Sequence, residues 1–258
     1  MTFLEHLGEL SRRLKKSLLV FIVAFAAVSS VPDPFHPFGG STALFGYNFL
    51  IVTLLHDAEI TYAPGQKFIA TSLTDPISVF INISLVVALV ISLPYVFAQV
   101  YGFVAPGLYQ RERKAVRKYI APFAALFAAG SIFGLFVIFP IVMRILLSFF
   151  PAFGLANLVS LNNFVSLLLL IPVITGFAFT FPVFLIPLVE LRILSARQLS
   201  GSRKWVYVII PLIVGLINPD PTFISSIPII IPIFVLFEIT IYIAKRIEAR
   251  RNLLVQNV

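Results

Sequence analysis

Residues Phe103–Lys118, with the sequence FVAPGLYQRERKAVRK, separate two long apolar runs and contain five of the chain's 19 Lys and Arg residues. A single acid, Glu112, lies among these cations. Each flanking run reaches the roughly 20 mostly apolar residues that a helix needs to cross a bilayer. Lys and Arg accumulate in the cytoplasmic loops of membrane proteins. The segment is therefore expected to be a cytoplasmic loop between two transmembrane helices.

The composition of the whole chain is typical of an integral membrane protein. Of its 258 residues, 59% are hydrophobic and only 12% are charged, whereas a soluble domain is usually about 45–50% apolar and about 25% charged. The chain has no Cys, which excludes disulfides, thiol nucleophiles and thiolate metal sites. The net charge of +8 does not indicate nucleic-acid binding, because the cations gather beside the apolar runs.

Six segments are candidates for spanning helices, and the first four are long enough. The fifth has 13 residues and would measure about 20 Å, against a hydrocarbon core of about 30 Å. Ser and Pro residues weaken the first half of the sixth. We expect an all-α protein with six transmembrane helices, the last two short; a re-entrant pair is the alternative for these two. The segments are Leu14–Val31, Ile77–Gly102, Tyr119–Met143, Phe164–Val189, Trp205–Ile217 and Ile224–Ala244.

Seventeen of the 19 Lys and Arg residues fall into four clusters. One lies at the start of the first candidate span, and the others follow the second, fourth and sixth. Both termini in the cytoplasm and an even number of spans satisfy the positive-inside rule at every loop. We expect a multi-pass protein of the cell membrane, embedded in the lipid bilayer as one domain of residues 1–258. Its parts would be a cytoplasmic amphipathic helix at 1–16, a long extracytoplasmic loop at 32–76, the first cytoplasmic loop at 103–118 and a cytoplasmic tail at 245–258.

The two outer loops differ in length and character. The first is rich in Pro, Gly and aromatic residues, and its apolar part, Phe45–Leu55, is expected to form a helix on the membrane surface or over the bundle. A connection of this length is usually functional or structured. The second, Arg144–Asn163, is shorter and nearly uncharged.

No catalytic or metal-binding pattern is recognisable in the sequence. The three histidines, His6, His36 and His56, lack the HExxH or a comparable metal spacing. A GxSxG elbow and a Walker A loop are also absent. We therefore expect no enzymatic activity, no cofactor and no metal.

Two acids are candidates for function. Glu238 is the only acid inside a predicted span, about 10 Å from its cytoplasmic end. Such a residue is a functional candidate, although a hydrogen-bonded packing role is the alternative. Glu112, taken alone, would ordinarily be a solvated ion-pair partner among its neighbouring cations. Near the N-terminus, Glu9 and Arg13 have the i, i+4 spacing of a favourable helical ion pair.

Six short motifs follow one another along nearly the whole chain: HLGELSRRL (His6–Leu14), FIATSLTDP (Phe68–Pro76), QVYGFVAPGLYQRER (Gln99–Arg113), FP (Phe139–Pro140), NPDP (Asn218–Pro221) and LFEI (Leu236–Ile239). Together they resemble the TatC family, the multispanning subunit of twin-arginine protein translocases. Six spans with cytoplasmic termini also match that family. The resemblance implies a membrane receptor for signal peptides with two consecutive arginines. It also implies single-span partners of the TatA and TatB types, export of folded precursors driven by the proton-motive force, and it allows a homo-oligomer.

The resemblance places the signal-peptide-binding residues in two segments. Glu112 corresponds to the recognition acid of the first cytoplasmic loop, with Phe103 and Pro106 in the same motif. Glu9 corresponds to the N-terminal acid, and Arg13 matches a basic position beside it. The chemistry agrees, because each guanidinium group pairs with a carboxylate through two N–H donors, and the predicted topology puts both acids on the cytoplasmic face.

The chain departs from the family pattern in the fourth span, where Thr180 stands at a position that often holds a membrane-embedded Glu. Thr180 can supply only a hydroxyl, and bonding back to its own helix is the alternative. Glu238 and Thr180 are the candidates for polar or partner contacts inside the membrane. Asp220 lies in the predicted extracytoplasmic turn. The competing function is a secondary transporter or channel for a small solute, which would need polar residues such as Asn82 and Gln99 to converge at mid-membrane.

Overall fold

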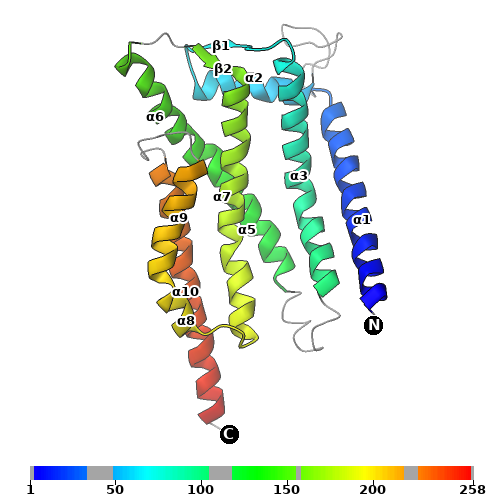
Figure 1. Ribbon diagram of the computed structural model, residues 1–258, viewed down its shortest axis with the longest axis vertical. Coiled ribbons are helices and arrows are strands. Elements are labelled where there is room, and N and C mark those ends of the chain that lie inside the picture. Colours follow the sequence, from blue (N-terminus) through cyan, green and yellow to red (C-terminus); the bar gives the residue numbers. More distant parts are fainter. Residues whose placement is uncertain (1–2, 34–48, 105–117, 155–157, 218–225, 257–258) are drawn as a thin grey trace. The chain divides into compact units, whose positions relative to one another are not determined.

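The computed structural model describes residues 3–33, 49–104, 118–154, 158–217 and 226–256. This part of the chain is almost entirely helical and contains one short sheet (Figure 1). It forms two compact units. The first comprises Met1–Pro106 and Leu147–Leu170, and the second comprises Gly107–Leu146 and Ile171–Val258.

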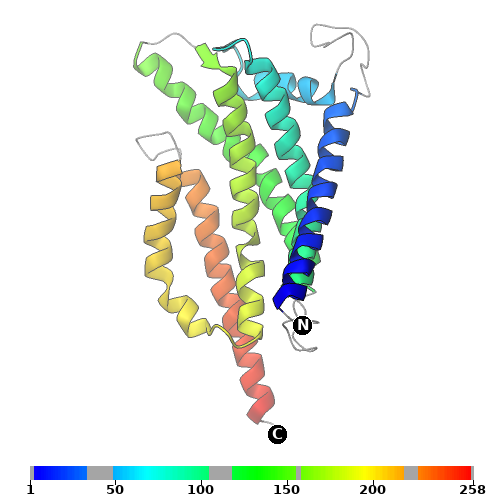
Figure 2. The same ribbon diagram turned by 45° about the vertical axis from the view of Figure 1, so that its right-hand side comes forward.

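In the first unit, α1 (Phe3–Ser30) and α3 (Asp75–Val104) lie side by side (Figures 1 and 2). The predicted amphipathic helix and the first predicted span form one uninterrupted helix, because no Pro or Gly interrupts the sequence between them. The start of α3 is fixed by Asp75. Its Oδ2 accepts hydrogen bonds from the backbone N–H groups of Thr71 (2.6 Å) and Ser72 (2.9 Å).

The first unit also contains α2 (Leu50–Tyr62) and a parallel pair of three-residue strands, β1 (Lys67–Ile69) and β2 (Leu158–Ser160). In the first turn of α2, the Thr53 hydroxyl donates to Asp33 Oδ2 at 3.1 Å. A helix is present in the region of the predicted Phe45–Leu55, but α2 begins five residues later and continues to Tyr62. Its place on the membrane surface or over the bundle stays a prediction. Strands of three residues carry too little alternation for the sequence to indicate them.

The second unit contains α5 (Ile120–Phe133), a π-helical turn η2 (Gly134–Ile138), most of α7 (Leu161–Glu190) and the beginning of α6 (Phe139–Ala152). The helical segment that contains the third predicted span, Tyr119–Met143, continues through α6 to Ala152. Arg144 therefore lies inside a helix and not in an outer loop. One Arg is compatible with an apolar helix, since its long side chain carries the charge away from the helix axis.

Small residues bring α5 and α7 close together within the second unit. The buried Thr175 hydroxyl donates to the Gly130 carbonyl oxygen at 2.9 Å, and also to Ile171 in its own helix. A Cβ at Gly130 would lie 2.7 Å from Phe179 Cβ, and a Cβ at Gly134 would lie 2.9 Å from Pro172 Cα. Helices in membranes associate through such close packing, because lipid supplies no hydrophobic driving force between them.

The C-terminal half of the second unit pairs α9 (Arg203–Ile217) with α10 (Ile227–Gln256), preceded by the short α8 (Ala196–Gly201) (Figure 2). Glu238 of α10 uses both carboxylate oxygens toward α9. Arg203 Nη2 donates to Oε2 and the Tyr207 hydroxyl donates to Oε1, each at 2.6 Å. The helix α10 also continues through most of residues 245–258.

Four helices in the described part of the chain are long and apolar enough to cross a membrane by length and composition. They are Asp75–Phe103, Ile120–Ala152, Leu161–Glu190 and Ile227–Arg250. Helix α1 carries four cations in its first half, and α9 has 15 residues, which is about 22 Å. The count of six spans therefore stays a prediction.

Gly130→Ala should lower the thermal stability of the detergent-solubilised protein, because the added methyl group has no space against Phe179 and the Thr175 carbonyl oxygen. Overpacking of this kind costs about 1–3 kcal/mol, which corresponds to roughly 2–10 °C in Tm for a chain of this size. Gly201→Ala is the matched control, because its Cβ would meet nothing within 4 Å. Equal Tm values for the two variants would contradict the close packing of α5 and α7.

Glu238→Gln should lower Tm by about 1–3 °C, because the amide cannot pair with Arg203 as a carboxylate does. The effect is modest because both side chains are about 40% exposed, and exposed pairs contribute little. Arg250→Gln, which removes an exposed charge from the same helix, is the control. A Tm in the Glu238→Gln protein no lower than in the control would show that the pair does not hold α9 to α10.

Candidate functional site

An ion pair in the N-terminal half of α1 is the most developed polar site among the described residues. Arg13 donates from Nε (2.9 Å) and from Nη2 (2.6 Å) to the same oxygen, Oε1 of Glu9. The residues are one helical turn apart, so both side chains lie on one face of α1. In a forked pair, the two donors would engage both carboxylate oxygens. Here both donors bind one oxygen.

The other carboxylate oxygen, Glu9 Oε2, is buried and has no hydrogen-bond partner among the residues that the structure describes. A buried acceptor without a partner costs about 1–3 kcal/mol, and more when it is charged. An N–H donor that reached this oxygen would recover that free energy. Glu9 Oε2 is therefore an acceptor positioned for a ligand with N–H donors.

Helix α3 supports the ion pair from the side. Arg13 Nη1 donates to Gln99 Oε1 at 3.3 Å, so all three guanidinium nitrogens have acceptors. One helical turn further along α3, Gly102 leaves space for the same guanidinium group: a Cβ there would lie 2.9 Å from Arg13 Cζ. These contacts are not recognisable from the sequence, because Arg13 and Gln99 are 86 residues apart.

The predicted signal-binding residues divide into two groups. Glu9 and Arg13 are paired, and Phe103 is half-buried near the end of α3, directly after Gly102. Glu112 and Pro106 lie outside the described residues, as does Asp220. The expected approach of Glu112 to Glu9 stays a prediction.

The predicted intramembrane polar residues have partners within the chain. Glu238 binds Arg203 and Tyr207, as described above. Thr180 is fully buried, and its hydroxyl donates to the Phe177 carbonyl oxygen of its own helix at 2.7 Å. The alternative predicted for Thr180 is a hydrogen bond from its hydroxyl to a carbonyl group of its own helix, and the structure contains that hydrogen bond. Sequence reasoning missed Thr175, which makes the bond between helices described above.

Two further acids are paired at other positions. Lys118 Nζ lies 2.8 Å from Glu190 Oε1, which joins the segment just before α5 to the end of α7. In α2, His56 Nδ1 lies 3.8 Å from Glu59 Oε2. Burial raises the pKa of Glu59 above its ordinary value, and the neighbouring His56 partly offsets the rise. Within the described residues, no three His, Asp or Glu side chains gather as a metal site would require.

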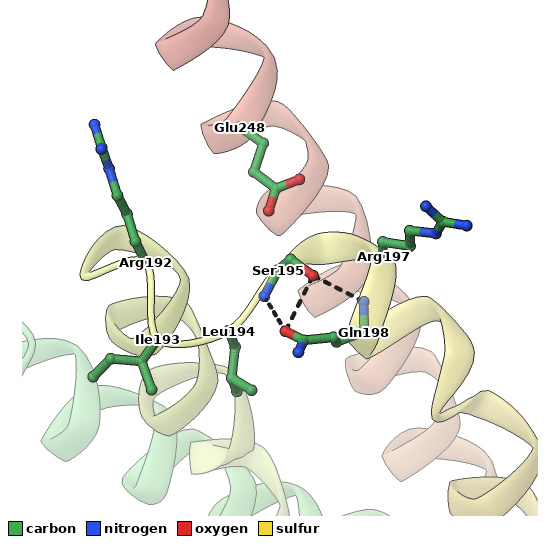
Figure 3. A pocket seen from close by; sticks show the side chains of 7 residues that line it. All are labelled: Arg192, Ile193, Leu194, Ser195, Arg197, Gln198 and Glu248. Carbon is green, nitrogen blue, oxygen red and sulfur yellow. Dashed lines mark hydrogen bonds between the residues drawn. The ribbon is translucent and has the colours of Figure 1, made fainter.

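A cavity of about 480 Å³ lies between α10 and the segment that joins α7 to α8 (Figure 3). Arg192 and Arg197 line it, but their side chains point away from each other and out of the space between them. Glu248 lines the same cavity, and its Oε1 accepts a hydrogen bond from the Ala196 backbone at 2.7 Å. The charges do not converge, so the geometry favours the Glu9 site over this cavity.

Comparisons with known proteins identify the family. Residues 5–232 match the family model "Sec-independent protein translocase protein (TatC)". The TatCy protein of Bacillus subtilis (strain 168) is 31% identical, with 95% of this chain and 89% of the relative aligned. The TatC protein of Azotobacter chroococcum mcd 1 is 30% identical over 98% of this chain and 92% of its own length.

A solved structure also matches. The crystal structure of the twin-arginine translocase receptor TatC in the detergent DDM aligns with a TM-score of 0.75 at 27% identity, covering 93% of this chain and 99% of that one. A second crystal structure of the same receptor has the same TM-score. Sequence and fold thus agree over nearly the whole length, and the chain belongs to the TatC family of Sec-independent protein translocase proteins.

Proposed function

We propose that this chain is the receptor subunit of a twin-arginine translocase in the cell membrane, with both termini in the cytoplasm. It binds the signal peptides of folded precursor proteins through their paired arginines. It then assembles with single-span subunits of the TatA and TatB types for export driven by the proton-motive force. Family membership supports the pathway, and the apolar helices support a membrane location.

The observation that carries the proposal of signal recognition is the carboxylate oxygen of Glu9 that has no hydrogen-bond partner. Arg13 occupies Oε1 with two donors, while Oε2 is buried and has no partner within the described residues. A guanidinium group of the signal would donate to Oε2 and complete the carboxylate. Glu112 would receive the second arginine, since two arginines need two carboxylates. Phe103 and Pro106 would contact the peptide beside the acids.

The arrangement favours arginine over lysine for a geometric reason. Guanidinium is planar and presents its N–H donors in fixed directions, whereas an ammonium group is a compact and strongly hydrated point charge. A buried acceptor with one open direction recovers its desolvation cost only from a donor that reaches it in that direction. Lysine also loses more hydration on entering such a site.

The competing function of a small-solute transporter or channel receives no support from the polar residues that the structure describes inside the helices. Thr180 bonds to its own helix, and Thr175 to the carbonyl groups of Gly130 and Ile171. Glu238 is engaged by α9 through Arg203 and Tyr207. These groups therefore have their hydrogen-bond partners within the protein.

A fluorescent signal peptide with two arginines should bind the purified full-length protein in nanodiscs at least about tenfold more tightly than the same peptide with two lysines. The factor corresponds to the loss of one charge-assisted hydrogen bond, about 1.5–3 kcal/mol. Fluorescence anisotropy at fixed salt measures both affinities. Equal affinities would overturn the proposed receptor function at this site.

Glu9→Gln and Glu112→Gln should each weaken binding of the twin-arginine peptide by roughly tenfold or more, because an amide replaces a charged acceptor. Photo-cross-linking to the peptide should fall in parallel while membrane insertion stays normal. Glu59→Gln is the matched control, since Glu59 lies in α2 and pairs with His56. A Glu112 variant that cross-links as the wild type does would remove Glu112 from the proposed site and leave Glu9 to be judged by its own result.

A further inference from the structure

Two residues of α3, Gln99 and Gly102, form a cradle for the Arg13 side chain. The Gln99 amide oxygen accepts from Nη1 at 3.3 Å. Gly102 allows the guanidinium group to lie against the helix backbone, because a Cβ at this position would come within 2.9 Å of Cζ and 3.2 Å of Nη2. The two residues are three apart, so they lie on the same face of α3. The cradle consists only of these two residues.

The cradle determines which donors of Arg13 reach Glu9. With Nη1 directed to Gln99, only Nε and Nη2 remain for the carboxylate, and both bind Oε1. Glu9 Oε2 is left as a buried acceptor without a partner in the described part of the chain. Nε and Nη2 can also bind the two oxygens of a carboxylate as a fork, which is the stronger arrangement. An Arg13 released from the orientation in which α3 holds it is free to turn and form that forked pair with both oxygens of Glu9. The forked pair would occupy the oxygen that a ligand needs.

We propose that Gln99 and Gly102 are positioning residues for arginine recognition: they hold Arg13 on one oxygen of Glu9 and so keep the other oxygen open for a guanidinium group of the ligand. This inference rests on the proposed receptor function and adds the determinant of its selectivity. Neither residue contacts the ligand. Both act through the direction of the Arg13 side chain.

Gly102 has the sharper geometric requirement of the two. Its glycine is not needed for backbone conformation, because Gly102 lies within the regular part of α3. Alanine is a better helix former than glycine, so Gly102→Ala should not disfavour the helical backbone in this last turn of α3. The atoms that oppose the extra methyl group belong to the end of the Arg13 side chain, which can move. The substitution therefore displaces Arg13 without a need to displace the backbone.

The test measures affinities for the twin-arginine and twin-lysine peptides with the full-length protein in nanodiscs. Gly102→Ala should reduce twin-arginine affinity by roughly tenfold, the effect of losing one charge-assisted hydrogen bond, and should reduce the preference over the twin-lysine peptide. Gly8→Ala is the matched control: it lies one residue from Glu9, and its Cβ would meet nothing within 4 Å. The control should bind within about twofold of wild type, since unobstructed surface substitutions have small effects.

Gln99→Leu is a second variant that adds no obstruction at Gly102. It removes the acceptor for Nη1 and should weaken twin-arginine binding by about threefold to tenfold, as expected for the loss of one hydrogen bond that fixes Arg13. This variant decides the matter if the Gly102→Ala protein fails to fold. Wild-type affinity in Gln99→Leu would then overturn the cradle.

The Arg13→Ala background separates positioning from helix packing. Arg13→Ala alone should weaken binding less than Glu9→Gln, because both oxygens of Glu9 remain. Adding Gly102→Ala to it should change nothing further, since the side chain that the methyl group displaces is gone. An equal loss from Gly102→Ala in both backgrounds, or a complete loss of binding from Arg13→Ala, would overturn the inference.

The failure of the inference is distinguishable from failure of the proposed function. If wild type prefers the twin-arginine peptide and Glu9→Gln loses it, while Gly102→Ala and Gln99→Leu bind as wild type does, the receptor function stands and the cradle is rejected. If wild type shows no preference, the proposed function itself is rejected, and the cradle with it.

Discussion

The need to satisfy polar groups within the chain governs where this protein places its chemistry. Hydrocarbon offers no hydrogen bonds, so every polar group at membrane depth needs a partner inside the protein. Several hydroxyl groups within the long helices follow this rule by donating to carbonyl groups one turn earlier, for example Ser84 to Phe80 and Thr240 to Leu236. Such hydroxyls have no remaining function to offer. The buried Ser131 hydroxyl of α5 is an exception, with no partner among the described residues. Among the acids with ion-pair partners, Glu190 lies at the end of α7 and Glu59 on the short α2, whereas Glu238, inside α10, has both oxygens engaged by α9.

Within that constraint, Glu9 differs from the other paired acids on the described part of the chain. Glu238 has both oxygens engaged, by Arg203 and by Tyr207. Glu9 has two donors on one oxygen and none on the other. An acid with both oxygens satisfied stabilises the fold, whereas an acid with one open oxygen carries a cost that a ligand can remove. The number of carboxylate oxygens with hydrogen-bond partners therefore separates Glu238, the structural acid, from Glu9, the candidate recognition acid.

The sequence predicts the features that depend on one segment at a time. Apolar length and cation placement indicated the long helices, and the i, i+4 spacing indicated the Glu9–Arg13 pair, which is present. Features that depend on two distant segments were not predictable. Arg13 contacts Gln99 and Gly102, and Thr175 contacts Gly130. The residues of each contact are too far apart in the sequence for a helix or strand periodicity to relate them. Arg144 misled the prediction, because a single cation resembles a loop boundary although α6 continues past it.

A ligand with two positive charges approaching a cation-rich face gains little from net attraction. At physiological ionic strength, exposed charges more than about 8 Å apart are largely screened, so the distant cations neither repel nor guide it strongly. The groups at contact distance decide, and there the Glu9–Arg13 pair is formally neutral. The neutral Gln99 amide holds Arg13 without adding a second carboxylate that would attract cations of any shape. On the proposed function, selectivity for arginine therefore lies in the direction of one open oxygen, and a residue that turns Arg13 changes selectivity without changing the net charge of the site.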